Sequence, residues 1–184
     1  MSGHAETARH LVVVDCESSG LRDKDFAVEV AWRNLSTGEH GYFVPVHSVD
    51  WVLKYGQPEA LAINGYQDRL ITAKQDHDQM GVAYLDEVLK GNVLAGSNPR
   101  ADAGWLEKAF EVDPGGGPWH HRLLDLSAYA AGVLGLDPRN LPGLARVCEL
   151  LGVDPEPEVH TAQAGVDTAT ACFLALLVKA GVQL

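Results

Sequence analysis

The sequence predicts an α/β protein in which helices cover a mixed β-sheet. Three observations support this class: strand patterns fill the first fifty residues, helical patterns alternate with short strands after that, and 184 residues suffice for one sizeable core. Hydrophobic residues make up 46% of the chain and charged residues 21%, which is typical of globular proteins. We therefore expect a single domain over residues 1–184, with residues 1–10 as a flexible N-terminal extension.

The strand patterns begin at residues 11–14, "LVVV", a β-branched run that is typical of a buried central strand and leads into acidic residues. The stretches "FAVEVAWRNL" (26–35) and "GYFVPV" (41–46) follow, separated by the turn-rich "STGEH". Together they predict an antiparallel hairpin beside the first strand. A fourth short strand is expected in "NVLAGSNP" (92–99), which ends in a turn.

The helical patterns fill most of the remaining chain. They cover residues 51–90, 101–112, 121–135 (after a short strand) and 141–153. Pro142 is suited to start the helix of residues 141–153, because proline is favoured at the first helical position. "DPEPEV" (154–159) predicts a stiff connector before a final helix.

Charge and composition exclude several classes of protein. The net charge of -11 argues against a broad basic surface for nucleic acid, although a carboxylate cluster loaded with divalent cations can still bind a phosphodiester. No apolar run approaches the roughly 20 residues needed to cross a bilayer, and the N-terminus lacks a signal-peptide pattern. The three cysteines form no C-x-x-C pair and are expected to be reduced and buried. We expect a cytoplasmic protein without membrane contact.

A pair of acidic residues follows the first strand. Asp15 and Glu17 are two residues apart, so they project to the same face of a strand while Cys16 points to the other. Two adjacent carboxylates repel each other unless cations lie between them, and hard oxygen ligands suit Mg²⁺ or Mn²⁺. A solvated strand end is the alternative interpretation of this pair.

The residues around this pair carry a family resemblance. "VVVDCESSGL", followed by "FAVEVAW", "TGE" and "YFVPVH", resembles the opening of the DEDDh family of 3'-5' exonucleases, the DnaQ-like branch of the ribonuclease H-like fold. The usual wording of the first motif in that family is close to D-x-E-T-T-G-L, and here two serines replace the two threonines. The resemblance implies a mixed five-stranded sheet flanked by helices.

The later motifs of that family are found in the expected order. "AINGY" is similar to a short element before the next helix, and "LAGSNPRADAGWL" is similar to the second motif, H-N-x-x-F-D-x-x-x-L. Asn98 and Asp102 of that motif are kept, while Ser97 and Ala101 replace its histidine and phenylalanine. "HTAQAGVDTATACFLALL" is similar to the third motif, so the resemblance spans residues 11–178.

The resemblance implies a role for each matching residue. Asp15, Glu17 and Asp102 would hold two divalent metal ions, Mg²⁺ or Mn²⁺, which stabilise the attacking and leaving oxygens at phosphorus. His160 would be the general base that activates the attacking water, a task suited to imidazole at neutral pH.

Three further residues are candidates for contact with the terminal nucleotide: Ser18, Gly20 and Asn98. Ser18 and Gly20 could offer hydroxyl or backbone contacts, while loop geometry is the alternative reason for Gly20. Asn98 could donate to substrate, or it could only shape the turn before Pro99.

The third motif calls for an acid at a position where this chain has none. The family places an aspartate five residues after the histidine, where this chain has Gly165, and the nearest acid is Asp167. In a helix that is regular from Gln163, Asp167 lies about 200° from Gly165 and points away from the core. If the helix starts after Gly165, Asp167 could instead turn into the site as a metal ligand.

Two functional hypotheses follow. The first is a metal-dependent 3'-5' exonuclease that releases nucleoside 5'-monophosphates from single-stranded 3' ends of DNA or RNA, with or without a polymerase or other replication partner. The second is a nucleic-acid- or protein-binding module on the same fold, impaired in catalysis because Gly165 stands in the place of an acid.

Overall fold

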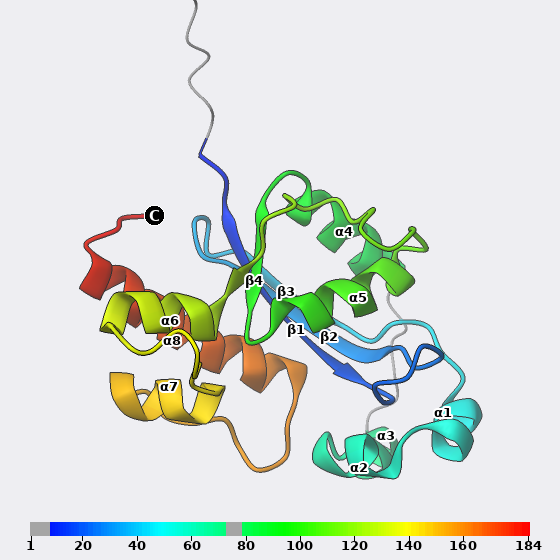
Figure 1. The fold of residues 1–184 in the computed structure, drawn as a ribbon. Helices are drawn as coiled ribbons and strands as arrows, with labels where there is room; N and C mark the ends of the chain where they lie inside the picture. Colours follow the sequence, from blue (N-terminus) through cyan, green and yellow to red (C-terminus); the bar gives the residue numbers. More distant parts are fainter. Residues whose placement is uncertain (1–7, 73–78) are drawn as a thin grey trace, which may run out of the picture.

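The structure, a computed structural model, describes residues 8–72 and 79–184. Its sheet consists of β1 (Leu11–Ser18), β2 (Ala27–Asn34), β3 (His40–Phe43), β4 (Val93–Gly96) and β5 (Leu124–Asp125). The order of the five strands is β3-β2-β1-β4-β5, and β1 lies in the middle (Figure 1). β2 pairs antiparallel with both β1 and β3, whereas β4 pairs parallel with β1 and β5. This mixed five-stranded sheet confirms the predicted fold class.

Helices cover both faces of the sheet (Figure 1). They are α1 (Val49–Tyr55), α2 (Pro58–Ile63), α3 (Tyr66–Thr72), α4 (Gln79–Leu89), α5 (Pro99–Ala109), α6 (Leu126–Leu134), α7 (Leu144–Leu151) and α8 (Ala162–Ala180). The helices α4 and α5 lie on one face, and α6, α7 and α8 lie on the other. The short helices α1 to α3 lie beside the carboxyl-terminal end of β1, where the Asn64 side chain donates to the Ser18 carbonyl at 3.1 Å.

The alternation of side chains along β1 determines which face each residue occupies. Val12 and Val14 are fully buried against α4 and α5. Leu11 and Val13 pack instead into the core that contains α6, α7 and α8. The same alternation continues to the end of the strand, so Asp15 follows Val13 onto the face covered by α8.

Several boundaries differ from the sequence prediction. The predicted strand 41–46 ends at Phe43, before Pro45, because proline has no N–H for a strand partner. The helical stretch 51–90 is divided into α1, α2, α3 and α4, and residues 73–78 of it lie outside the described residues. The prediction that Pro142 starts a helix is wrong: Gly143 is the extended N-cap residue of α7, which leaves Pro142 before the helix.

Two other expectations concern the chain ends and the membrane. Residues 1–7 of the expected N-terminal extension lie outside the described residues. His10, also assigned to that extension, is bound to the sheet region, since its N–H donates to Asn92 Oδ1 at 2.9 Å and its carbonyl accepts from Val93. None of the helices in the described parts of the chain is long and apolar enough to cross a membrane.

Candidate active site

Asp15 and Glu17 occupy the carboxyl-terminal end of β1. Both face α8, and Glu17 lies opposite Glu29 in the register with β2. The strand backbone holds both residues, because β1 is hydrogen-bonded to β2 along its whole length and to β4 in its first half. The two carboxylates therefore share one face of the sheet, as the two-residue spacing predicted.

Asp102 reaches the same strand end from α5. β4 stops at Gly96, and α5 begins at Pro99, which places Asp102 in the first turn of the helix. Its side chain is buried, and Oδ1 accepts a hydrogen bond from the Cys16 backbone N–H at 3.0 Å. This bond ties the start of α5 to β1, and it brings the third predicted acid to the first two.

His160 lies directly before α8, and backbone contacts fix its position. Its N–H donates to the Ile63 carbonyl at 3.0 Å, and its own carbonyl accepts from Arg69 Nη1 at 3.4 Å. Thr161 is the N-cap residue of α8, and its side chain accepts from Ala164 N at 3.0 Å. The imidazole itself is 45% exposed, so it can meet both the carboxylates and a substrate.

An ion pair that the sequence analysis missed supports His160. Arg69 pairs with Glu29 of β2, and the other Glu29 oxygen accepts from the Ala162 N–H at 3.2 Å. Arg69 also donates to the Asn64 carbonyl at 3.1 Å. These contacts connect α3, β2 and the start of α8, so they position the histidine, although Arg69 lies outside the stretches quoted above and Glu29 of "FAVEVAW" was given no role there.

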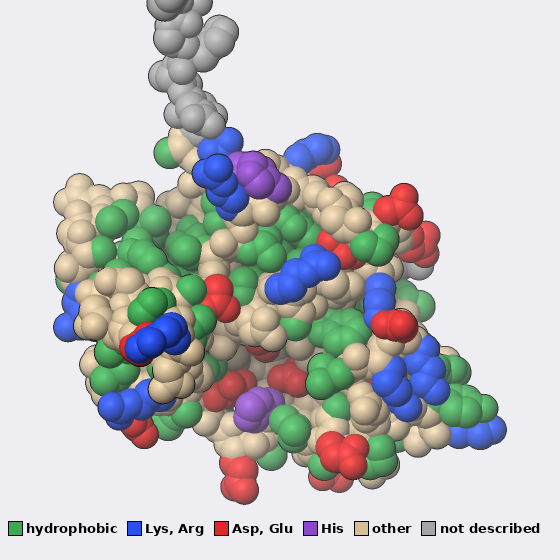
Figure 2. All heavy atoms as spheres, in the orientation of Figure 1, with side chains coloured by type: hydrophobic (Ala, Val, Ile, Leu, Met, Phe, Trp, Pro, Cys, Tyr) green, Lys and Arg blue, Asp and Glu red, His purple; other side chains and the backbone are tan. Residues whose placement is uncertain are grey.

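Glu156 is a second site residue that sequence reasoning missed. One ligand atom each from Glu17, Glu156 and His160 lie within 4.8 Å of one another. The Glu156 side chain is only 13% exposed, and Oε2 lies 3.8 Å from His160 Nδ1. Figure 2 shows acidic side chains together with a histidine in the lower centre of the molecule. The available signal was an acid four residues before the histidine, within a connector treated only as a spacer.

Gly165 occupies the position that faces Asp15. It is buried in the first turn of α8, and a Cβ atom built there would lie 2.5 Å from Asp15 Oδ2. The helix starts at Ala162, so it includes Gly165, as in the first of the two alternatives considered for this stretch. The position of the expected acid therefore points into the site but carries no side chain.

Asp167 does not belong to the carboxylate cluster, which corrects its assignment as a metal ligand. Its Oδ1 accepts from Arg33 Nη2 at 2.9 Å, and its Oδ2 accepts from the Gln163 side chain at 3.1 Å. The Asp167 side chain is 51% exposed. The physical reason is helical geometry, because two residues after Gly165 the side chain has turned about 200° to the outer side.

A cavity of about 350 Å³ lies beside the acidic strand end. It is lined by Asp15, Cys16, Glu17, Ser18, Leu21, Gln57, Glu59, Ala60, Ile63, Asn64, Ser97, Ala101, Asp102 and Trp105. The cavity combines the three predicted acids with apolar walls, and its volume falls in the range of ordinary small-ligand sites.

The three candidate substrate-binding residues are placed differently. Ser18 lines the cavity, and its hydroxyl donates to the Gly20 carbonyl at 2.9 Å. Gly20 has a φ of 151°, and a Cβ there would lie 2.4 Å from Gln57 Oε1, so loop geometry requires glycine. Asn98 is exposed, has a φ of 66° and precedes α5 without a side-chain cap bond. It shapes the turn, and Ser97 lines the cavity in its place.

The clustered acids hold their protons more tightly than ordinary carboxyl groups. Burial raises the pKa of Glu17 to about 7, and the nearby Glu29 carboxylate adds to the rise. Burial also raises the pKa of Asp102 to about 7, against the hydrogen bond from Cys16. For Asp15, burial and the Asp102 and Glu17 carboxylates raise the pKa well above its usual value.

This donor set fits hard divalent cations. Its oxygens come from carboxylates, and among the described residues no hydrogen-bond donor reaches the Asp15 carboxylate. Mg²⁺ and Mn²⁺ prefer such oxygen ligands, and a dication would relieve the repulsion that raises the pKa values. Asp15, Glu17 and Asp102 are therefore suited to hold the ions that the family resemblance implies.

Comparisons with known proteins agree with this geometry at the level of the fold. No protein-family model matches the sequence, and no curated protein matches it either. Solved structures do match. One is described as the crystal structure of a full-length 3'-exonuclease, with a TM-score of 0.64, 12% identity and coverage of 100% of this chain and 65% of that one.

The chain has the fold of a 3'-exonuclease. A second solved structure, described as 3'-end specific recognition of a histone mRNA stem-loop by a 3'-exonuclease, gives a TM-score of 0.60 at 12% identity. That match covers 96% of this chain and 84% of the other. The resemblance to DEDDh exonucleases is thus confirmed for the 3'-exonuclease fold, while this chain spans only about two thirds of the first matching structure, 65% of its length.

Proposed function

We propose that this protein is a metal-dependent 3'-5' exonuclease that hydrolyses phosphodiester bonds at single-stranded 3' ends and releases nucleoside 5'-monophosphates. One observation carries the proposal: Asp15, Glu17, Asp102 and His160, which come from three distant parts of the chain, meet at one end of β1 in a chain with the 3'-exonuclease fold. A solvated strand end would not bring a buried acid and a histidine to the same place.

The three acids and the histidine would have different roles in this reaction. Asp15, Glu17 and Asp102 would hold Mg²⁺ or Mn²⁺, and such ions neutralise phosphodiester charge and stabilise both the entering and the leaving oxygen. His160 has a half-exposed imidazole and a fixed backbone, so it can accept the proton of the attacking water. As the new bond from water to phosphorus forms, the bond from phosphorus to the 3' oxygen of the preceding nucleotide breaks.

The cavity walls suit a terminal nucleotide. Trp105 offers an aromatic surface on which any base can stack, and Leu21 and Ile63 add apolar surface beside it. Asn64 and Ser97 add polar groups at the same cavity. With a net charge of -11, the protein would bind phosphate through its loaded carboxylates instead of a basic surface. Because one of the similar structures concerns the 3' end of a histone mRNA stem-loop, RNA 3' ends belong among the first substrates to test.

A second candidate function rests on Gly165. A glycine that faces Asp15 leaves the site one carboxylate short of the family pattern, which favours a binding module with impaired hydrolysis. Such a module would still present the cavity and its apolar walls to a nucleic-acid end. Hydrolysis therefore separates the two candidates.

The test is hydrolysis of 5'-labelled single-stranded RNA and DNA oligonucleotides in Mn²⁺ or Mg²⁺ by the wild type and by Asp15→Ala. We expect stepwise shortening from the 3' end by the wild type, and a loss of roughly 10³-fold in Asp15→Ala because one of the carboxylates that would hold the ions is gone. A folded wild type that shortens none of these substrates but still binds them would support the binding module. Equal cleavage by both proteins would contradict the assignment of this site.

A further inference from the structure

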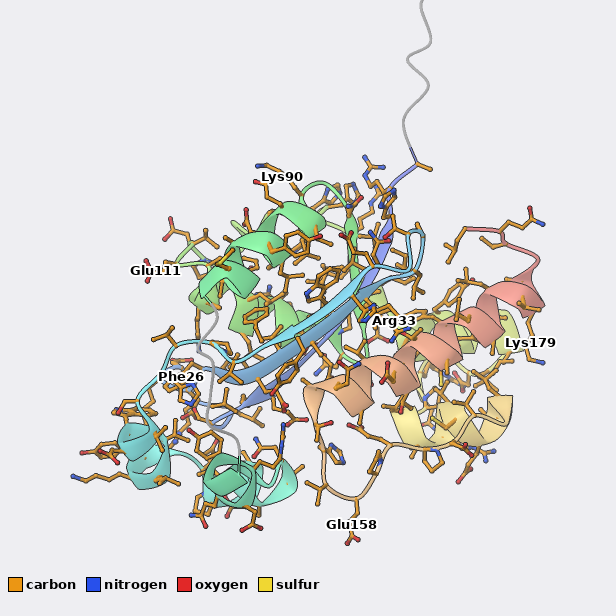
Figure 3. The ribbon with its side chains drawn as sticks, turned by 180° about the vertical axis from the view of Figure 1, so that it is seen from behind. Phe26, Arg33, Lys90, Glu111, Glu158 and Lys179 are labelled. Carbon is orange, nitrogen blue, oxygen red and sulfur yellow. The ribbon has the colours of Figure 1, made fainter. Side chains whose placement is uncertain are left out.

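The connector before α8 offers a carboxylate that no motif assigns. Residues 154–159 contain Glu156 and Glu158, each followed or preceded by proline. The Glu156 side chain turns inward and is 13% exposed, whereas Glu158 is exposed and lies at the tip of the connector, directed away from the sheet (Figure 3). Two chemically identical side chains of one connector thus have opposite environments.

Glu156 is close enough to Glu17 to share an ion with it. One ligand atom from each of these residues and from His160 lie within 4.8 Å of one another. Ligand oxygens on opposite sides of one Mg²⁺ are about 4.2 Å apart, so a small closure of the connector suffices for joint coordination. The Glu156 Oε2 to His160 Nδ1 distance of 3.8 Å is too long for a hydrogen bond.

A second observation, independent of this cluster, points to a cation. The Asp15 carboxylate lies against Gly165, with Oδ2 at 2.5 Å from the position of a Cβ there, and receives no hydrogen bond from any described residue. Desolvated carboxylates are normally paired or coordinate metals. Around Asp15 the structure places further carboxylates, those of Asp102, Glu17 and Glu156. Carboxylates gathered in this way favour a divalent cation among them.

We propose that Glu156 is a metal ligand of this site and supplies, from the connector, the carboxylate that Gly165 does not supply from α8. Glu17 and Glu156 would hold the ion together, next to His160. The inference rests on the proposed function for the identity of the ion, Mn²⁺ or Mg²⁺. It makes the carboxylate count of the site four, with Asp15, Glu17, Asp102 and Glu156, and it leaves His160 unliganded as the base.

The test is Mn²⁺ binding to the metal-free full chain, measured by calorimetry and by electron paramagnetic resonance. Glu156→Gln should weaken binding by at least about tenfold, since even the loss of residues that only support a ligand has effects of this size. Glu158→Gln is the matched control, because it makes the same change in charge on an exposed side chain of the same connector that is directed away from the sheet, and it should bind Mn²⁺ like the wild type. Melting temperatures of both metal-free variants check that they fold.

A double variant tests the replacement itself. Gly165→Asp should restore Mn²⁺ affinity in the Glu156→Gln background, because either position would then deliver the missing oxygen. Equal Mn²⁺ affinity of Glu156→Gln and Glu158→Gln would overturn the inference, and so would a wild type that binds no Mn²⁺. Hydrolysis measured on the same samples separates the two proposals: a wild type that binds Mn²⁺ through Glu156 but cleaves nothing would refute the exonuclease and support the ligand.

Discussion

The two halves of the candidate site are held by different kinds of structure. Asp15, Glu17 and Asp102 belong to β1 and to the first turn of α5, where strand and helix hydrogen bonds fix the backbone. Glu156 and His160 belong to the connector between α7 and α8, which long-range contacts from Ile63 and Arg69 hold in place. The common direction of Asp15 and Glu17 follows from local periodicity, and Asp102 joins them through its bond to Cys16. The position of His160 depends instead on residues more than 90 positions away in the chain.

The largest effect on hydrolysis is expected from removing the imidazole of His160, in the connector before α8. His160→Ala should lower hydrolysis by about 10² to 10⁴-fold, because a positioned general base contributes that much. The melting temperature should change little, since the contacts of His160 with Ile63 and Arg69 involve its backbone. Single-turnover rates and thermal melts give both quantities. His121→Ala removes an exposed histidine elsewhere and should leave both unchanged; equal rates for the two variants would exclude His160 as the base.

Gly165→Asp would place a carboxylate on α8, opposite the carboxylates of β1. Gly165→Asp should raise hydrolysis in Mn²⁺ about tenfold through an added ligand. It should also destabilise the metal-free protein, because a Cβ at this position lies 2.5 Å from Asp15 Oδ2 and adds a further negative charge. Gly165→Ala repeats the steric change without a ligand, so it should lose stability and gain no activity. A gain in both variants would show that the carboxylate is not the cause.

The acids of β1 and α5 should make the stability of the protein depend on pH. The pKa of Glu17 and of Asp102 is raised to about 7, above the ordinary values of 4.5 and 3.8. Between these limits the folded state binds more protons than the unfolded state, so stability is present at low pH and lost as pH rises. The melting temperature of the metal-free protein should fall by roughly 5 °C from about pH 5 to about pH 8.

Divalent cations should reverse this trend. Coordinating carboxylates must be deprotonated, so Mn²⁺ should bind more tightly above pH 7 and raise the melting temperature more at pH 8 than at pH 5. Thermal melts with Mn²⁺ and with a chelator measure both effects. A metal-free melting temperature that rises steadily over this range would be inconsistent with buried, repelling acids.

The smallest effect on hydrolysis and stability is expected at Asp167, the acid that the sequence analysis considered as a metal ligand. Asp167→Ala removes a half-exposed ion pair with Arg33, and such pairs contribute less than about 1 kcal/mol to stability. Hydrolysis should be unchanged, because the side chain lies on the outer side of α8. A loss of activity comparable to that of His160→Ala would mean that α8 begins later in the active protein than in this structure.

Much of the fold followed from patterns that depend only on near neighbours. The β-branched run before Asp15 predicted a central strand, and its two-residue alternation placed Asp15 and Glu17 on one face. Helical periodicity also identified the outward direction of Asp167, once the start of the helix was known. The sequence left that start undecided, and the structure places it at Ala162, two residues after His160, with Thr161 as the N-cap residue.

The site residues that the sequence did not predict were missed for one physical reason. Glu156 lies in an irregular connector, where no period relates a residue to a face, and its inward direction depends on where α7 and α8 end and begin. The ion pair of Arg69 with Glu29 joins α3 to β2 across the molecule. Long-range contacts of this kind leave no local pattern in the sequence, so only the assembled fold reveals them.

The contacts of Arg69 have a mechanical consequence. One guanidinium group joins the carbonyls of Asn64 and His160, and the His160 N–H binds the neighbouring Ile63 carbonyl. Ile63 and Asn64 line the cavity, so we expect one of its walls and the histidine to move together. A ligand that pushes this wall outward would displace the imidazole with it. The fit of a terminal nucleotide in the cavity would then be coupled to the alignment of His160, the proposed general base.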